Sequence, residues 1–160
     1  MSSDGIGTAA HDGGGLPAAD SAAEGRRGLI EQRHVTARDG TRIGYQVRGN
    51  SGPAVVLANG LGGTYIAFTH LYAALTDYRT VCWDYRGLYT SAAPKDPRAN
   101  TVAHQVEDLM AILEQEKIGD FIIVGWSMGV QVAFETIRHH PERVKGVLAI
   151  NGTCGVPGHE

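Results

Sequence analysis

The residues best suited to chemistry lie in the pentapeptide Gly125-Trp126-Ser127-Met128-Gly129. A serine in the pattern G-x-S-x-G acts as a nucleophile when a sharp turn from a strand into a helix exposes its hydroxyl group. Such a turn crowds its neighbours, and the small residues two positions before and after the serine relieve that crowding. Backbone N–H groups at the start of the following helix can stabilise a negatively charged oxygen. The pentapeptide therefore predicts attack of Ser127 on an acyl carbonyl.

The sequence on either side of this pentapeptide predicts the two elements that the turn requires. Residues 121–124 are a short apolar run rich in β-branched side chains, which is typical of a buried strand. The residues after Ser127 have a helical period, with one apolar face made of Val130, Ala133, Phe134 and Ile137. A bare G-x-S-x-G match also occurs by chance, and a plain Gly/Ser turn is the alternative interpretation. The flanking strand and helix favour the catalytic one.

The rest of the chain predicts a hairpin followed by alternating strands and helices. Residues 35–47 predict two antiparallel strands joined at Asp39-Gly40, because apolar residues alternate along the second strand. Apolar runs predict buried strands at residues 54–58, 79–83 and 144–150. Helical periods predict one helix around residues 68–75 and a second helix from residue 100 or 101 to Gly119. This order predicts an α/β fold, with a mostly parallel sheet and helices on both faces. Ligands bind beyond the carboxyl ends of the strands in such sheets.

Length and composition limit the class of protein. The chain has 160 residues, with 14 Lys and Arg against 17 Asp and Glu, so it can form one domain with a core and has no strongly basic surface for nucleic acid. No apolar run is long enough to span a membrane, and the first residues lack the features of a secretory signal. Cys82 and Cys154 do not form a disulfide framework. We therefore expect a cytoplasmic protein that binds neither nucleic acid nor membrane.

The N-terminal segment has a different composition from the rest of the chain. Residues 1–28 are dominated by Gly, Ala, Ser and Asp, with almost no large apolar side chain. Such a segment cannot bury enough apolar surface to offset the entropy lost on ordering. We expect a disordered Gly/Ala-rich tail at residues 1–28 and a folded domain at residues 29–160.

Four motifs between about residues 35 and 153 together resemble the α/β-hydrolase superfamily. They are a loop at residues 59–62 resembling the family's oxyanion loop, a D-x-R-G-x-G-x-S-like turn at residues 84–91, the elbow at residues 125–129, and a link at residues 140–144 resembling Y-P-E-R-V. Two residues depart from the pattern, since Asn59 replaces the usual His of the oxyanion loop and Tyr89 replaces the second glycine of the turn. The resemblance implies a truncated α/β-hydrolase fold of about six strands, without the last two strands and the cap.

The resemblance also implies a role for each matching residue. Ser127 would be the nucleophile. The other site residues are Leu61 and Met128, whose backbone N–H groups would form the oxyanion hole, and Asn59, Gly60 and Trp126, which would contact the substrate. Asp84, Arg86 and Ser91 would brace the turn after the fourth strand. Serine at position 127 argues against haloalkane dehalogenases and epoxide hydrolases, which resemble this pattern but use aspartate there.

A serine nucleophile needs a base to take its proton and an acid to orient that base. In this fold the chain order is serine, acid, histidine. Asn151-Gly152-Thr153 stand where some relatives place the acid, and His159 and Glu160 lie too close to the last predicted strand to be the usual pair. We therefore expect a missing C-terminal half to supply both groups, and the isolated chain to be inactive.

These observations predict a serine hydrolase, similar to a carboxylesterase, that acts on an ester or related acyl bond of a small molecule. Three other reactions use the same elbow and are alternatives to ester hydrolysis: lactone hydrolysis, acyl transfer and cofactor-free perhydrolysis. We expect no cofactor and no metal; residues 60–65 partly match a dinucleotide-binding loop, but Tyr65 stands at its third glycine position. The alternative function is a catalytically incomplete fragment that acts as a scaffold or self-associates. In either case the missing half or a second copy would cover an exposed sheet edge.

Overall fold

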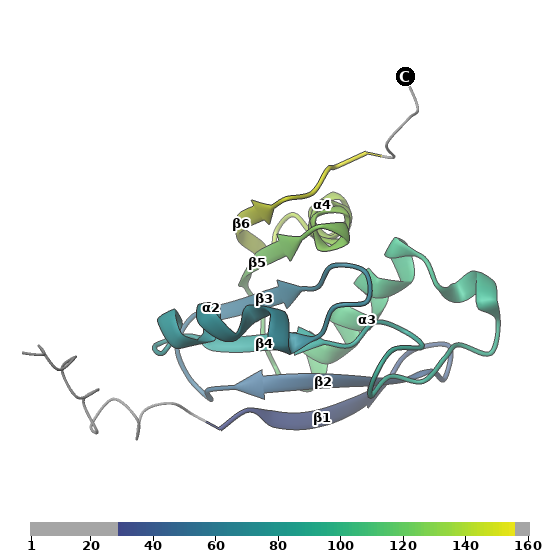
Figure 1. Cartoon of the computed structure of the whole chain (residues 1–160), viewed down its shortest axis with the longest axis horizontal. Helices are drawn as coiled ribbons and strands as arrows, with labels where there is room; N and C mark the ends of the chain where they lie inside the picture. Colours follow the sequence, from purple (N-terminus) through teal and green to yellow (C-terminus); the bar gives the residue numbers. More distant parts are fainter. Residues whose placement is uncertain (1–28, 156–160) are drawn as a thin grey trace, which may run out of the picture.

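The computed structural model describes residues 29–155, so the tail predicted at residues 1–28 lies outside the described part. Six strands form one sheet in the order β1-β2-β4-β3-β5-β6 (Figure 1). The strands are β1 (Glu31–Thr36), β2 (Arg42–Arg48), β3 (Ala54–Ala58), β4 (Arg79–Trp83), β5 (Phe121–Trp126) and β6 (Val144–Ile150). The helices are η1 (Tyr65–Phe68), α2 (Thr69–Ala74), η2 (Pro97–Ala99), α3 (Val102–Gln115) and α4 (Met128–His139).

The sheet is antiparallel at one side and parallel through its centre. β1 pairs antiparallel with β2, and β2 pairs antiparallel with β4. β3 lies between β4 and β5 and is parallel to both, and β6 adds a further parallel strand beside β5. All five residues of β3 are buried, as expected for a central parallel strand. The predicted α/β class with a mostly parallel sheet is therefore confirmed.

Helices cover both faces of this sheet. On one face, Val106 and Leu109 of α3 and Ala133 of α4 join the larger core cluster with β-strand residues. On the other face, Phe68 of η1 and Tyr72 of α2 belong to a second cluster. Within the described residues, β6 has a paired neighbour on one side only, and its Val147 and Leu148 are 40% and 49% exposed. The sheet thus has an open parallel edge.

The end of α3 differs from the sequence prediction. The helix begins after Thr101, whose side chain accepts a hydrogen bond from the N–H of His104. It ends at Gln115 rather than at Gly119, because Lys117 takes the left-handed conformation with φ 54° that closes a helix. A lysine can adopt this conformation at some energetic cost, so the glycine further along is not the stop signal.

The buried face of α4 also differs in part. Phe134 was predicted on that face and is 42% exposed, whereas Val132 and Thr136 are buried. The helix lies so close to the sheet that a Cβ atom on Gly129 would be 2.0 Å from the carbonyl oxygen of Ala58. The face of α4 that contains Gly129 is therefore the one that can pack against the sheet. Phe134 points away from the sheet.

Among the helices of residues 29–155, none combines the length and the apolar character needed to cross a lipid bilayer.

Candidate active site

Ser127 lies in the sharp turn between β5 and α4 that the sequence predicts. Its backbone has φ 54° and ψ −116°, a conformation that costs a non-glycine residue about 1–3 kcal/mol. The N–H of Ser127 donates to the carbonyl oxygen of Ile150 at 2.9 Å, which ties the turn to the end of β6. The residue is exposed, and its side chain makes no capping hydrogen bond to α4. The hydroxyl group therefore stands at the carboxyl edge of the sheet.

Two glycines make this turn sterically possible. A Cβ atom on Gly125 would lie 2.4 Å from the carbonyl oxygen of Gly129. A Cβ atom on Gly129 would in turn lie 2.0 Å from the carbonyl oxygen of Ala58. Both distances are far below van der Waals contact, so the spacing G-x-S-x-G is a packing requirement at both ends.

The predicted oxyanion loop, residues 59–64, packs directly against this turn. Ala58 at the end of β3 pairs with Gly125 of β5, so the loops that follow the two strands leave the sheet side by side. A Cβ atom on Gly60 would lie 3.3 Å from Cβ of Ser127 and 3.0 Å from Cε3 of Trp126. The structure thus brings together the segments that carry all six predicted site residues.

The two predicted oxyanion-hole donors lie on either side of this contact. Leu61 follows Gly60, and its side chain is 79% exposed. Met128 is the first residue of α4, where helix N–H groups have no intrahelical acceptor. Anions are stabilised at such a helix end, because the aligned peptide dipoles place partial positive charge there. Their catalytic role stays a prediction.

The side chain of Asn59 lies inside the protein. It is 0% exposed, and its Nδ2 donates to the carbonyl oxygen of Trp83 at 3.0 Å and to Sγ of Cys82 at 3.2 Å. Burial raises the pKa of the Cys82 thiol to about 12, so sulfur accepts this bond as a neutral thiol. Asn59 therefore attaches the loop to β4, and its predicted contact with substrate would have to come from its backbone.

Two further hydrogen bonds hold the loop, and the sequence alone did not indicate them. The hydroxyl of Tyr85 donates to the carbonyl oxygen of Asn59 at 2.6 Å. Burial raises the pKa of the Tyr85 phenol well above its usual value, which keeps it a donor. At the other end of the loop, Oγ1 of Thr64 donates to Oδ1 of Asp84 at 3.1 Å. The loop is therefore anchored at both ends to the segment around β4.

The turn after β4 is braced by polar contacts, in keeping with the structural role implied for its residues. Oγ of Ser91 donates to the carbonyl oxygen of Asp84 at 2.6 Å and accepts from the N–H of Gly44 at 2.8 Å. Arg86 donates two hydrogen bonds to Asp108 of α3, both 2.7 Å long, and the two side chains are 1% and 0% exposed. This bidentate geometry locks the turn to α3.

A cavity of about 320 Å³ borders both predicted oxyanion-hole residues. It lies where the turn after β4 faces the start of α3 and of α4. Its lining residues are Leu61, Tyr85, Arg86, Leu88, Asn100, Thr101, Val102, Gln105 and Met128. Apolar side chains contribute much of this wall, so the cavity can bury a small apolar group.

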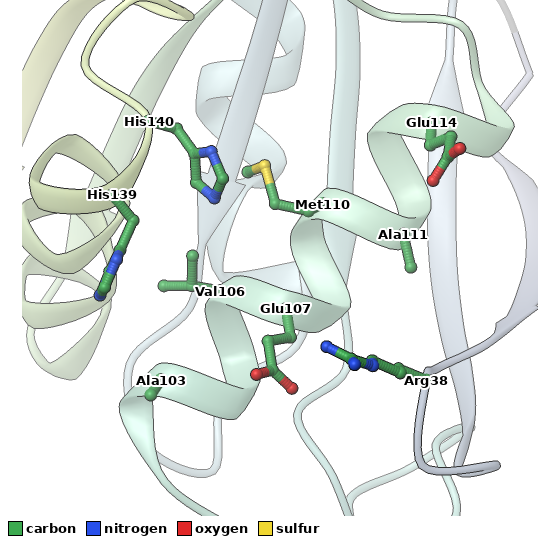
Figure 2. Close-up of a pocket in the computed structure, with 9 residues that line it drawn as sticks. All are labelled: Arg38, Ala103, Val106, Glu107, Met110, Ala111, Glu114, His139 and His140. Carbon is green, nitrogen blue, oxygen red and sulfur yellow. The ribbon is translucent and has the colours of Figure 1, made fainter.

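A second groove, of about 510 Å³, lies elsewhere on the surface. It runs along α3 between Arg38 and the two histidines that end α4, His139 and His140 (Figure 2). Ser127 stands at the opposite end of α4, and a 12-residue helix is roughly 18 Å long. This groove is therefore too far from Ser127 to contribute to its chemistry.

Two of the described histidines, His104 and His139, have polar partners of their own. Nδ1 of His104 is 2.7 Å from Oγ1 of Thr101 at the start of α3, and Nε2 of His139 is 3.0 Å from Glu135 in the last turns of α4. Within residues 29–155, no hydrogen bond joins the Ser127 hydroxyl to a histidine, and no group of three His, Cys, Asp or Glu side chains could hold a metal ion. His159 and Glu160, which stand too close to the last predicted strand to be the usual acid and base, lie outside the described range.

Comparison with known proteins gives consistent matches. The family model described as "alpha/beta hydrolase fold" matches residues 53–160. A putative 2-succinyl-6-hydroxy-2,4-cyclohexadiene-1-carboxylate synthase of Bacillus subtilis is 31% identical over 124 residues, which cover 77% of this chain and 45% of that protein. Epoxide hydrolase 2 of Siraitia grosvenorii is 31% identical over 103 residues, covering 63% of this chain and 33% of that protein. The chain thus spans less than half the length of these relatives.

Solved structures show the same relationship. An epoxide hydrolase from Vigna radiata superimposes with a TM-score of 0.69 at 27% identity, covering 75% of this chain and 38% of that one. An α/β hydrolase from Novosphingobium aromaticivorans also gives a TM-score of 0.69, at 29% identity, covering 75% of this chain and 43% of that one. From its sequence and from its fold, the chain belongs to the α/β-hydrolase family.

Proposed function

We propose that this chain carries the nucleophile and the oxyanion hole of a serine hydrolase that cleaves an ester or a related acyl bond. The observation that carries the proposal is the geometry of Ser127, which is exposed at φ 54° with the Gly60 backbone packed against its side chain. A strained serine with helix N–H groups and a glycine loop beside it is the arrangement that acyl transfer requires.

The proposed reaction begins with attack of Oγ of Ser127 on the acyl carbonyl carbon. The carbonyl π electrons move to the oxygen, and the N–H groups of Leu61 and Met128 stabilise that negative charge. Each such donor contributes about 2.7–4 kcal/mol in related enzymes. A base takes the serine proton and returns it to the leaving alcohol, and water then cleaves the acyl-enzyme. We place this base and its acid in a C-terminal half beyond this chain.

Epoxide hydrolysis is the second candidate, because two of the similar proteins above are named epoxide hydrolases. The residue at position 127 separates the two reactions. A serine oxygen that opened an epoxide would form an ether, and water does not readily cleave an ether. A serine oxygen that attacks an acyl group forms an ester, which water cleaves when the same base activates it. Ser127 therefore favours acyl chemistry.

A fluorophosphonate probe tests this proposal, because it phosphonylates activated serines and mass spectrometry locates the label. We expect the label on Ser127 in the wild-type chain, at a slow rate because we place the base outside this chain, and no label at this position in Ser127→Ala. Ser51→Ala is the matched control, since Ser51 is exposed in the loop between β2 and β3, and should be labelled like the wild type. Labelling that is absent from Ser127, or spread equally over other serines, would exclude the proposed nucleophile.

Turnover separates the two candidate reactions and locates the base. Adding the polypeptide that completes the family's fold should give hydrolysis of p-nitrophenyl acetate and no hydrolysis of styrene oxide. The 160-residue chain alone should hydrolyse neither. If the chain alone hydrolysed the ester as fast as the completed protein, a base within this chain would be required, and the proposed division would be wrong.

The open edge of the sheet supports a further proposal about partners. Val147 and Leu148 of β6 are half-exposed, and β6 is paired only with β5 among the described strands. We propose that a C-terminal half or a second copy of the chain covers this edge. The same edge supports the alternative role, a scaffold or self-associating module.

A further inference from the structure

Tyr89 has a backbone conformation that side chains normally avoid. It stands at the position where the D-x-R-G-x-G-x-S turn has its second glycine, and its φ is 47°. A bulky residue in this left-handed region is strained, and it persists only where its surroundings over-determine it. The tyrosine thus occupies a glycine conformation at an energetic cost, and its side chain makes a contact that a glycine cannot make.

That contact is with the predicted oxyanion loop. The hydroxyl of Tyr89 donates to the carbonyl oxygen of Gly62 at 2.6 Å. Tyr89 is 65% exposed, so burial of the ring does not account for its placement. The hydrogen bond crosses from the turn after β4 to the loop after β3 and joins residues that are 27 positions apart in the chain.

Gly62 lies in the middle of the loop at residues 59–64, and nothing lies within 4 Å of a Cβ atom built on it. It has φ 74°, and the N–H of Gly63 donates to the carbonyl oxygen of Gly60 at 2.9 Å to close a four-residue turn. The peptide group between Gly62 and Gly63 is therefore bound at both polar ends, its N–H by Gly60 and its carbonyl by Tyr89. Leu61, the predicted oxyanion-hole donor, lies inside this turn.

We propose that Tyr89 is a positioning residue that holds the Gly60–Gly63 turn and so orients the N–H of Leu61 beside Ser127. This step rests on the proposed serine chemistry. Three glycines in one short loop have a large conformational freedom to lose, and a donor stabilises an oxyanion best when it is already in place. Asn59 and Thr64 anchor the two ends of the loop, whereas Tyr89 holds its middle.

The test compares three variants of the chain. Tyr89→Phe removes the hydroxyl and keeps the ring, and Tyr89→Gly removes the side chain and the backbone strain together. Tyr78→Phe is the matched control, because it removes a phenol at the opposite end of β4. For each we would measure the carbonyl ¹³C shift of Gly62 and hydrogen exchange at the Gly63 amide by NMR, the thermal midpoint, and the rate of fluorophosphonate labelling at Ser127.

We expect exchange at Gly63 to rise about fivefold in Tyr89→Phe, with a shifted Gly62 carbonyl signal, as for the loss of one hydrogen bond. Labelling of Ser127 should slow by a similar factor, with a fall of at most a few degrees in the thermal midpoint. Tyr89→Gly should show the same two losses even if it gains stability from relief of strain. Tyr78→Phe should match the wild type in the Gly62, Gly63 and Ser127 measurements.

Two results would overturn the inference. The first is unchanged exchange and an unchanged Gly62 signal in Tyr89→Phe. The second is faster exchange with labelling as fast as in the wild type. Failure of the proposed function has a different signature, since it is the absence of Ser127 labelling in the wild type, and the NMR measurements then decide by themselves whether Tyr89 holds the turn.

Discussion

At the scale of single residues, the candidate site depends on positions where a side chain would be too large. Three glycines allow β5, α4 and the loop after β3 to approach one another within contact distance; they are Gly60, Gly125 and Gly129. Ser127 and Tyr89 both have positive φ, and both contact the loop after β3. Strain of this kind is typical of functional sites, because the surrounding packing keeps it in place.

The first prediction at this scale concerns the steric requirement at Gly129. Gly129→Ala should destabilise the chain by about 1–3 kcal/mol or more, because its Cβ would meet the Ala58 carbonyl oxygen at 2.0 Å. Helix propensity alone favours alanine over glycine by only about 1 kcal/mol, so the clash decides the sign. Urea denaturation followed by circular dichroism measures the change.

Gly119→Ala is the control for this substitution. Nothing lies within 4 Å of a Cβ atom built on Gly119, so this variant should unfold at the wild-type urea concentration or slightly above it. Equal midpoints for the two alanine variants would mean that α4 can move away from β3, and that the close approach is not required for folding.

At the scale of elements, a buried arginine connects segments that flank the site. Arg86 follows β4 and pairs with Asp108 of α3 and with Asp39 in the turn between β1 and β2, the latter at 2.5 Å. Burial alone would raise the pKa of Asp39, but hydrogen bonds from Thr41 and the charge of Arg86 hold it at about 2. Burial raises the pKa of Asp108, and Arg86 opposes this rise. Arg86 thus ties the turn that carries Tyr89 to two other elements.

The prediction at this scale compares a buried ion pair with an exposed one. Asp108→Asn should cost about 3–5 kcal/mol, because it leaves the Arg86 charge buried without its bidentate partner. Asp96→Asn breaks the exposed pair of Asp96 with Arg98, whose side chains are 49% and 91% exposed, and it should leave the stability unchanged. Chemical denaturation at pH 7 gives both values. A small effect of Asp108→Asn would show that Asp39 alone compensates Arg86.

At the scale of the whole molecule, the two edges of the sheet differ in character. β1 lies at one edge and β6 at the other (Figure 1). β1 is part of an antiparallel hairpin, whereas β6 presents half-exposed apolar residues. The relatives are more than twice as long as the matched segment, which covers 45% of the synthase from Bacillus subtilis. An unpaired apolar strand favours association with another chain.

This architecture predicts that the isolated chain self-associates through β6. Size-exclusion chromatography with light scattering should show a mass that rises with protein concentration. Leu148→Lys should shift the chain towards monomer, because it places a charge on the open edge. Ile66→Lys is the control, since Ile66 is 62% exposed on η1 outside this edge, and it should associate like the wild type. A monomeric mass at every protein concentration would contradict self-association through β6.

Local patterns in the sequence were sufficient for the architecture. Alternating and continuous apolar runs predict all six strands, and the glycines around Ser127 predict the turn between β5 and α4, since both signals depend on near neighbours in the chain. The same holds for the start of α3 at Thr101, where a side chain caps the helix that follows it. The role of Ser127 as a nucleophile stays a prediction from the same pattern.

The sequence by itself determined the order of elements, the family and the position of the turn at Ser127. Only the tertiary structure decided where side chains point: Asn59 into the interior, Phe134 to the surface, and Tyr89 onto Gly62. The physical reason is separation along the chain, because the bonds of Tyr89 with Gly62 and of Arg86 with Asp108 join residues 27 and 22 positions apart. Periodicity describes neighbours within a few residues, whereas such contacts form only once the strands have brought distant loops to the same edge of the sheet.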